Sequence, residues 1–200
     1  MHSKNIFFKN FKIKKKTSNI KKILAKLLKE DNQILYSLGK DYKDSYIKES
    51  LSKYKKYKNL RIIGMGGSSL GTRAIYNFLK HKINKKLSFF DNLQIKKIKS
   101  NKKHLNLIVS KSGNTLETIV NSNIFINKLD KNIFITENKK SYLYELGNKL
   151  KSEIVHHNNF IGGRYSVLSE VGMLPAELMG LNPSKFRQLN NLVKNQNFMK

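Results

Sequence analysis

The sequence predicts an α/β fold: a doubly wound parallel sheet as the middle layer of a three-layer sandwich, preceded by a helical N-terminal extension. Short apolar runs alternate with stretches of helical periodicity from residue 59 onward. Two of these runs end in loops rich in Gly and Ser, and each loop leads into a helix. Strands that alternate with helices of this length imply a parallel sheet covered on both faces.

The first 57 residues are expected to form the helical extension. Residues 1–16 make a polar, lysine-rich lead-in, and Thr17 or Ser18 can cap the helix that follows. Apolar residues recur in that helix at helical spacing, at Ile20, Ile23, Leu24, Leu27 and Leu28. A second, highly charged helical stretch is expected over residues 42–57. We expect this extension to pack on the main domain.

The main domain is expected to span residues 58–182 and to begin with two strand–loop–helix units. The first strand, Leu60–Ile63, continues into the loop Gly64–Ser69 and then into a helix that reaches Leu79. The second strand, Leu105–Val109, continues into the loop Ser110–Thr115 and a helix whose apolar residues include positions 119, 124, 126 and 129. Each unit therefore places a polar loop at the carboxyl end of a buried strand.

Two further strands and several helices complete the predicted order. Asn132–Thr136 is a third strand, followed by a helix over Ser141–Leu150 and a short fourth strand, Ile154–His156. The apolar stretch 165–181 is expected to be helical on either side of Pro175, because proline interrupts the helical hydrogen-bond ladder. A last helix is expected over residues 185–194, within a C-terminal segment 183–200 that leads toward a second domain.

Composition limits the possible functions. The chain contains no cysteine, which excludes disulfides and thiolate metal sites and fits a cytoplasmic location. No apolar run approaches the roughly 20 residues that span a bilayer. The formal net charge of +27 is typical of nucleic-acid binders. However, the lysines are scattered along the chain and only four arginines occur, so we favour a compositional bias over nucleic-acid binding.

The loop Ser110–Thr115 is the strongest candidate binding site. In an open parallel sheet, ligands bind at the carboxyl ends of the strands, and the following helix offers free amides to an anion. Hydroxyl groups at Ser110, Ser112 and Thr115 can donate to one phosphate. Gly113 permits a close backbone approach. Lys111 can add positive charge or point into solvent.

Other loops give weaker signals. Gly64–Ser69 is neither a dinucleotide fingerprint nor a P-loop, because Ser69 occupies the place of the third glycine and no Gly-Lys-Ser/Thr follows. Its glycines can let a sugar approach the backbone. Gly162, Gly163 and Arg164 follow a strand, where an arginine can stabilise developing negative charge. The adjacent residues His156 and His157 face opposite sides of an extended strand and are interpreted as structural.

These three loops, in this order, resemble the motifs of glucose-6-phosphate isomerase. The matching segments are Ile63–Gly71, Ser110–Thr118 and Gly162–Ser169. The middle motif is shared by sugar-isomerase (SIS) domains in general, whereas the last resembles the isomerase signature closely and extends through Pro175. The resemblance covers about residues 58–182. One departure is Glu170, where the family usually has a small residue, so we expect altered local packing there.

The resemblance implies roles for individual residues. The positions that hold the sugar phosphate correspond to Ser110, Lys111, Ser112 and Thr115. The turn that lines the sugar corresponds to Gly67 and Ser68, and the motif whose arginine stabilises the enediolate corresponds to Gly163 and Arg164. No metal and no organic cofactor are implied.

The reaction that the resemblance implies interconverts glucose 6-phosphate and fructose 6-phosphate in glycolysis and gluconeogenesis. In the family, the catalytic glutamate, the ring-opening histidine and a late lysine lie beyond the resembling region, and the sequence offers no counterpart of them. The chain therefore resembles an N-terminal part of the enzyme with the first SIS domain, expected to bind sugar phosphate without isomerising it. The family works as a homodimer, and a complementary C-terminal half is a possible partner.

Two alternatives remain open on the sequence alone. A non-catalytic SIS-domain sensor of sugar phosphates would carry a DNA-binding unit ahead of the domain, but residues 17–57 show no compact three-helix pattern. Another SIS enzyme, such as a different sugar-phosphate isomerase or an amidotransferase half, would not need the long match around Arg164. The isomerase is therefore the favoured interpretation.

Overall fold

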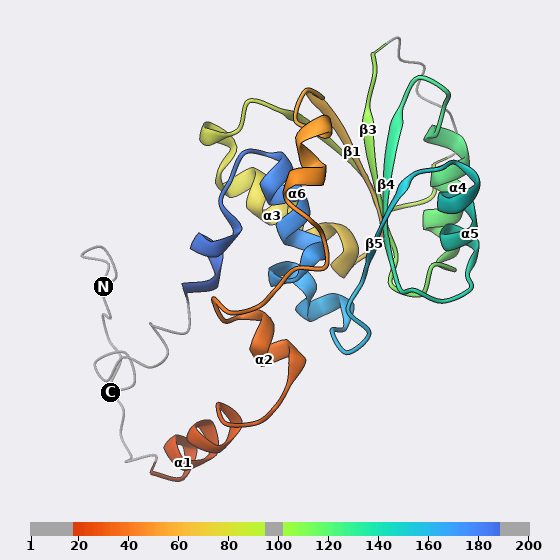
Figure 1. Ribbon diagram of the computed structural model, residues 1–200. Coiled ribbons are helices and arrows are strands. Elements are labelled where there is room, and N and C mark those ends of the chain that lie inside the picture. Colours follow the sequence, from red (N-terminus) through yellow and green to blue (C-terminus); the bar gives the residue numbers. More distant parts are fainter. Residues whose placement is uncertain (1–17, 95–101, 189–200) are drawn as a thin grey trace.

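A computed structural model of the chain describes residues 18–94 and 102–188 (Figure 1). Its centre is a five-stranded sheet in which all neighbouring strands are parallel, in the order β2-β1-β3-β4-β5. The strands are β1 (Asn59–Ile63), β2 (Lys86–Phe90), β3 (Leu105–Val109), β4 (Lys131–Thr136) and β5 (Glu153–His156). The predicted parallel α/β architecture is confirmed.

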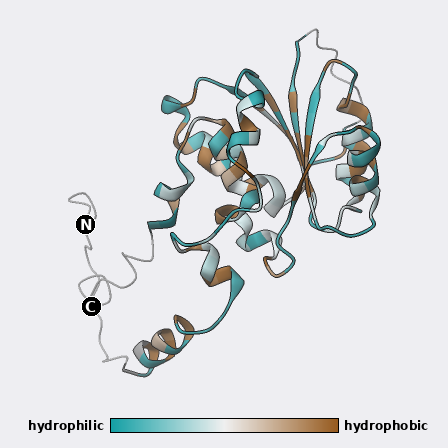
Figure 2. Ribbon diagram, in the orientation of Figure 1, coloured by the Kyte–Doolittle hydropathy of each residue, from teal (hydrophilic) through white to brown (hydrophobic). Residues whose placement is uncertain are grey.

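Helices cover both faces of the sheet. One face carries α3 (Gly67–Phe78) and α6 (Glu170–Leu178), and the other carries α4 (Leu116–Phe125) and α5 (Tyr142–Lys149), as Figure 1 shows. Hydrophobic residues are frequent along the strands at the centre, whereas the helices carry a mixture of hydrophobic and hydrophilic residues (Figure 2). This is the three-layer arrangement that the alternation of strands and helices predicts.

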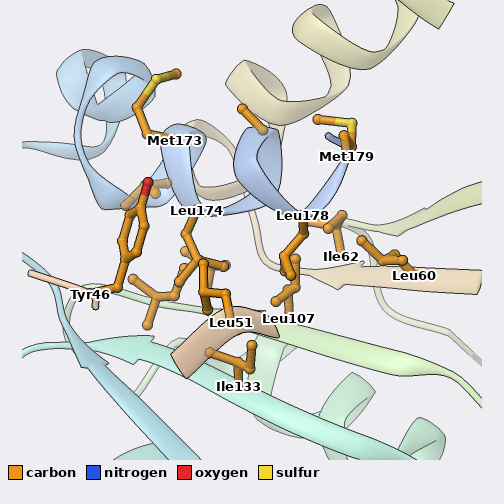
Figure 3. Packing of buried hydrophobic residues seen from close by; sticks show 14 of the residues in the cluster. Tyr46, Leu51, Leu60, Ile62, Leu107, Ile133, Met173, Leu174, Leu178 and Met179 are labelled. Atoms are coloured by element: carbon orange, nitrogen blue, oxygen red, sulfur yellow. The ribbon is translucent and has the colours of Figure 1, made fainter. Parts of the chain in front are cut away.

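Alternation along each strand divides the core into two layers. Ile62 and Leu107 face the α6 side, where the largest cluster of buried hydrophobic residues lies. Their neighbours Ile63 and Ile108 belong to a separate cluster on the α4 and α5 side. The strands β1, β3 and β4 are buried on both faces, which explains why they read as continuous apolar runs. In Figure 3, Leu174 and Leu178 of α6 point toward the sheet residues Ile62, Leu107 and Ile133.

The strand β2 was not expected from the sequence. This strand lies at the edge of the sheet and pairs only with β1. Its first four residues alternate between exposed and partly buried positions, and only its last residue, Phe90, is buried. Lysines precede it and its apolar run is short, so no continuous signal marks it. The position of β2 matters because it makes the chain reverse direction across the sheet between β1 and β3.

The N-terminal region differs from the prediction. The helix α1 (Ser18–Leu27) forms as expected, but Ile20 and Ile23 remain 60% and 59% exposed, so its apolar side is not packed on the domain. A short helix, α2 (Gln33–Ser37), follows. The prediction of a helix over residues 42–57 is wrong, because only Glu49–Tyr54 is helical, as the 3₁₀ turn η1.

The segment before η1 joins the main core instead. Tyr42 and Tyr46 are buried, as are Leu51 and Tyr54 of η1. Their spacing of three to five residues suggests a helix, but side chains of this segment bond to distant parts of the fold. The Ser45 hydroxyl, for example, donates to the His156 carbonyl. Tertiary contacts therefore determine its conformation.

The region around Pro175 is a single helix. The chain is helical on both sides of this proline, as expected, but the expected interruption is wrong, because α6 runs through it, preceded by the 3₁₀ segment η3 (Gly163–Leu168). Proline cannot donate to the carbonyl of Val171, four residues earlier. The Thr72 hydroxyl of α3 lies 3.4 Å from that carbonyl and donates to it instead.

The final segments are short. The 3₁₀ turns η2 (Lys80–Lys82) and η4 (Pro183–Gln188) are present, so the α-helix expected from residue 185 is 3₁₀ as far as 188. The rest of that predicted helix, and the lead-in 1–16, lie outside the described residues. The predicted domain boundaries stay predictions. Within residues 18–94 and 102–188, no helix is long and apolar enough to cross a membrane.

Candidate functional site

The candidate site lies where the sheet order reverses. The strands β1 and β3 are neighbours, but their chain connections run to opposite edges of the sheet. In doubly wound sheets this arrangement leaves a crevice at the carboxyl ends of the two strands, which is where ligands bind. The loop Gly64–Ser69 leaves β1, and the loop Ser110–Thr115 leaves β3. The fold therefore places both candidate loops beside this crevice.

Hydroxyl groups converge in the second loop. The Ser110 Oγ lies 2.9 Å from the Thr115 Oγ1, and it also accepts a hydrogen bond of 3.2 Å from the Gly113 amide. The Ser112 Oγ accepts from the Asn114 amide at 3.3 Å, and Ser112 is exposed. The loop is thus closed on itself through its own side chains, with Ser110 beneath and Ser112 at the surface.

Gly113 is required by the packing of this loop. Its φ is +68°, and a Cβ atom there would lie 2.1 Å from the Ser141 hydroxyl. The loop rests on the start of α5, since the Gly113 carbonyl accepts from the Leu143 amide at 3.0 Å. The side chain of Asn114 accepts from the Tyr142 amide at 2.9 Å. These contacts fix the loop at the amino end of α4.

The first turn of α4 is open to an anion. Thr115 is the N-cap residue, but its side chain makes no capping hydrogen bond, because its hydroxyl is paired with Ser110. The first amides of a helix have no partner within the helix and carry partial positive charge. An anion at this position can accept from them and from the nearby hydroxyls.

Lys111 connects the second loop to the segment just before the third. Its ammonium donates to the Asn159 carbonyl at 2.6 Å and lies 3.7 Å from the Glu137 carboxylate. The side chain therefore reaches across to the segment that precedes Gly162 rather than into open solvent. A hydrogen bond from Lys139, aided by the charge of Lys111, holds the pKa of Glu137 below its usual value.

Gly67 and Gly163 bring the remaining loops together. A Cβ atom on Gly67 would lie 2.1 Å from the Gly163 carbonyl oxygen and 2.9 Å from the Arg164 amide. The two backbones therefore touch at a point where only glycine fits. Ser68 follows directly and is half-buried, with its side chain free to donate. Sequence reasoning placed all four residues in candidate loops but could not predict this contact.

Arg164 differs from the other arginines. Arg61, Arg73 and Arg187 each form an ion pair with an aspartate. Arg164 is exposed and has no hydrogen-bond or ion-pair partner within the described part of the chain. The chain has 40 basic residues, of which only four are arginines. Three of these arginines form structural ion pairs, and the fourth, Arg164, is unpaired among the residues that the structure describes and lies in the third loop.

Glu170 is accommodated by a polar cluster that sequence reasoning missed. It is fully buried at the start of α6, where it accepts from the Tyr42 hydroxyl at 3.0 Å and the Asn158 amide at 2.7 Å. His157 is 1% exposed and lies 3.9 Å from the same carboxylate. Burial lowers the pKa of His157. The expected change in packing at Glu170 is therefore a set of specific contacts, made in part by the N-terminal segment.

The three loops therefore lie close together. Gly67 of the first loop touches Gly163 of the third, Lys111 of the second binds Asn159 just before the third, and a Cβ on Gly64 would lie 2.7 Å from the Val109 carbonyl at the end of β3. No group of three or more His, Cys, Asp or Glu side chains that could hold a metal occurs among residues 18–94 and 102–188. The arrangement can bind an anion at the amino end of α4, and the unpaired guanidinium of Arg164 belongs to the loop that touches Gly67.

Comparison with known proteins shows which family the chain resembles. The phosphoglucose isomerase family model matches residues 48–197. The glucose-6-phosphate isomerase of Methanocaldococcus jannaschii is 35% identical over 181 residues, covering 80% of this chain and 44% of the relative. That of Borreliella afzelii is 30% identical over 204 residues, covering 87% of this chain and 38% of the relative.

Solved structures agree on the fold. A hypothetical protein of Thermus thermophilus superposes with a TM-score of 0.67 at 21% identity, covering 88% of this chain and 47% of that one. Tagatose-6-phosphate ketose/aldose isomerase of Escherichia coli superposes with a TM-score of 0.50 at 16% identity, covering 72% and 46%. This chain spans less than half the length of the glucose-6-phosphate isomerases that it matches. By its sequence, the chain belongs to the glucose-6-phosphate (phosphoglucose) isomerase family.

Proposed function

We propose that this chain provides the sugar-phosphate-binding part of a glucose-6-phosphate isomerase active site. The loop Ser110–Thr115 binds the phosphate of glucose 6-phosphate or fructose 6-phosphate. The sugar carbons extend toward Gly67, Ser68 and Gly163, and Arg164 stabilises the enediolate. The observation that carries the proposal is that two family motifs leave neighbouring strands at the reversal point of the sheet, while Gly67 of the first touches Gly163 of the third and Lys111 of the second binds Asn159, just before the third.

The geometry of the second loop supports phosphate binding. A phosphate at the amino end of α4 accepts from backbone amides and from the hydroxyls of Ser112 and Thr115, and it sits in the positive field of the helix dipole. Binding requires the Thr115 hydroxyl to donate outward while it still accepts from Ser110, which the pair geometry of 2.9 Å allows. The large positive charge of the chain adds a long-range attraction for the anion.

Arg164 acts on the charge that develops during the reaction. A guanidinium stays protonated, so Arg164 cannot remove the proton at C2. It can instead stabilise the enediolate oxygen by charge-assisted hydrogen bonds. The carboxylates in contact with the loop segments are already engaged: Glu137 binds two lysines, and Glu170 accepts from Tyr42 and Asn158. We therefore propose that the base and the ring-opening acid lie outside the described residues.

A titration tests the binding step. Fructose 6-phosphate should shift the amide NMR signals of residues 110–118 and of Gly163, whereas fructose without phosphate should leave them unchanged. The double variant Ser112→Ala/Thr115→Val should weaken binding about tenfold or more, because it removes two donors to a charged group. Unmoved signals in this loop at saturating ligand would refute the proposed phosphate site.

A second comparison isolates the role of Arg164. Arg164→Lys should bind fructose 6-phosphate with nearly unchanged affinity but lose about tenfold or more for a sugar-phosphate hydroxamate that mimics the enediolate. Equal losses for both ligands would assign Arg164 to ground-state binding. The purified chain should not interconvert the two sugar phosphates, and measurable conversion would place the base within it.

A further inference from the structure

A cavity opens at the amino-terminal end of the sheet, on the side opposite to the candidate active site. It has a volume of about 660 Å³ and lies at the amino end of β4, between the carboxyl ends of α4 and α5 and the end of η1. Because β3 and β4 run in the same direction (Figure 1), the loops Ser110–Thr115 and Gly64–Ser69 lie at the other ends of the strands. Its volume is within the range of small-molecule sites, roughly 300–1,000 Å³.

Positive charge surrounds this cavity. Five lysines line it, and Lys53 among them is paired with Glu153 at 3.0 Å. The other four, which are Lys56, Lys128, Lys131 and Lys151, are exposed and have no acidic partner among the described residues. The carboxyl ends of α4 and α5 contribute only about half a negative charge each. The field of the cavity is therefore clearly positive.

The acidic residue of the cavity does not cancel this charge. Asp130 lines the cavity, but its carboxylate is fully buried and lies 3.0 Å from the Arg61 guanidinium. It also accepts from the His104 amide at 2.9 Å and from the Asn127 side chain at 2.8 Å. These donors use its acceptor capacity, so an anion entering the cavity meets the lysines rather than a free carboxylate.

Lys151 adds an independent observation. It follows α5 in the left-handed conformation, with a φ of +49°. Among the described residues other than glycine, it is the only one with a positive φ. Its amide bonds to the Asn148 carbonyl and that of Ser152 bonds to the Gly147 carbonyl, which is the usual helix-ending motif with glycine at this place. A lysine is strained there, and such strain often marks a functional position.

Apolar surface completes the lining. Tyr54 and Tyr57 of the η1 region, together with Ile126 and Leu150, contribute the apolar part of the wall. A ligand with several negative charges can therefore contact lysines and a planar or apolar surface at once. We propose that this cavity is a second ligand site, separate from the sugar-phosphate loops, and that it binds small molecules with a chain of phosphate groups, of the nucleoside triphosphate or inorganic polyphosphate class.

Calorimetric titration of the chain with ATP and with inorganic tripolyphosphate, at physiological ionic strength, tests the proposal. The triple variant Lys128→Gln/Lys131→Gln/Lys151→Gln should weaken binding about tenfold or more. The matched control Lys22→Gln/Lys40→Gln/Lys82→Gln removes the same charge from exposed positions elsewhere and should change affinity less than about twofold. Equal losses in both triples would show unspecific attraction by the net charge and overturn the proposal.

Competition and one further variant sharpen the result. If ATP binds more tightly than tripolyphosphate, the site recognises a nucleotide; if the two affinities are equal, it recognises the phosphate chain alone. Both results support the site. Displacement of ATP by fructose 6-phosphate would assign it to the active-site loops and overturn the proposal. Lys151→Gly should raise the urea midpoint of unfolding, because it relieves the backbone strain, and should weaken binding about threefold. Unchanged affinity in this more stable variant would contradict the role of Lys151.

Discussion

Single glycines define how the candidate site is closed. Gly67→Ala should push α3 away from the third loop, because its new Cβ would lie 2.1 Å from the Gly163 carbonyl. We expect a loss of about 1–3 kcal/mol in the free energy of unfolding and at least about tenfold weaker binding of fructose 6-phosphate. Urea unfolding and NMR titration measure the two effects.

The neighbouring glycine provides the control. Gly66 has a φ of +55°, but a Cβ there would meet no atom within 4 Å. Gly66→Ala should therefore lose stability through backbone strain, about 1–3 kcal/mol, without displacing the third loop. If both variants shift the amide signals of Gly163 and Arg164 equally, the contact between Gly67 and Gly163 is not what positions this loop.

Glu170 and Tyr42 should act as a coupled pair. Glu170→Ala leaves two buried donors, the Tyr42 hydroxyl and the Asn158 amide, without an acceptor, which should lower the free energy of unfolding by about 3 kcal/mol. Tyr42→Phe removes one donor and should lower it by about 1 kcal/mol. In the double variant we expect a coupling of about 1 kcal/mol, since the hydroxyl is no longer orphaned. Strict additivity in urea unfolding would show that the hydrogen bond contributes nothing.

Helices and strands can be predicted from the sequence where a local pattern of apolar residues determines them. The strands β1, β3 and β4 are buried on both faces, so their apolar runs identify them within a residue. The half-exposed edge strand β2 has no such run, and the switch point that depends on it could not be derived. The conformation of residues 42–48 depends on partners more than 100 positions away, which no local pattern reveals.

The same limit applies to the site. The loops around Ser110 and Gly67 were recognisable because glycine and hydroxyl residues cluster after strands. The contact of Lys111 with Asn159, and the support of Glu170 by Tyr42, join segments that are far apart in sequence. These contacts arise from the packing of the whole domain, so they are properties of the fold rather than of any motif.

The segment that contains Asp44 should be essential for stability. The Arg187 guanidinium lies 2.6 and 3.0 Å from the two carboxylate oxygens of Asp44, and it also donates to the Leu168 carbonyl at the end of η3. Both side chains of the pair are less than 10% exposed. Asp44→Ala therefore leaves a buried, unpaired charge, and we expect a loss of about 3–5 kcal/mol in the free energy of unfolding.

The control for this element is a more exposed pair of the same chemistry. Arg73 and Asp91 also form an ion pair, at 2.7 Å, but their side chains are 36% and 23% exposed. Asp91→Ala should lower the free energy of unfolding by less than about 1 kcal/mol. Similar losses in the two variants, measured by urea unfolding, would mean that residues 42–46 are not an integral part of the domain.

For the whole molecule, buried histidines should make stability depend on pH. Burial lowers the pKa of His157 below the ordinary value of 6.5, and burial together with the nearby Arg61 does the same for His104. Below pH 6.5 the unfolded chain therefore binds protons that the folded chain does not. The free energy of unfolding should be highest above this pH and fall as the pH drops, by up to about 1.4 kcal/mol per pH unit for each histidine.

Carboxylates should add a second loss at lower pH. A hydrogen bond from Lys139 lowers the pKa of Glu137, and hydrogen bonds from Ser50 and Lys53 outweigh burial to lower that of Glu153. These groups stabilise the fold above pH 4.5, and their contribution is lost as the pH falls below that value. Urea unfolding at half-unit steps from pH 8 to 4 should thus show a decline that begins near 6.5 and steepens below 4.5. His157→Gln should reduce the decline between pH 6.5 and 4.5 and leave the steeper decline below pH 4.5 unchanged. A wild-type free energy of unfolding that is constant between pH 7.5 and 5.5 would show that the two imidazoles accept protons in the folded core as readily as in the unfolded chain.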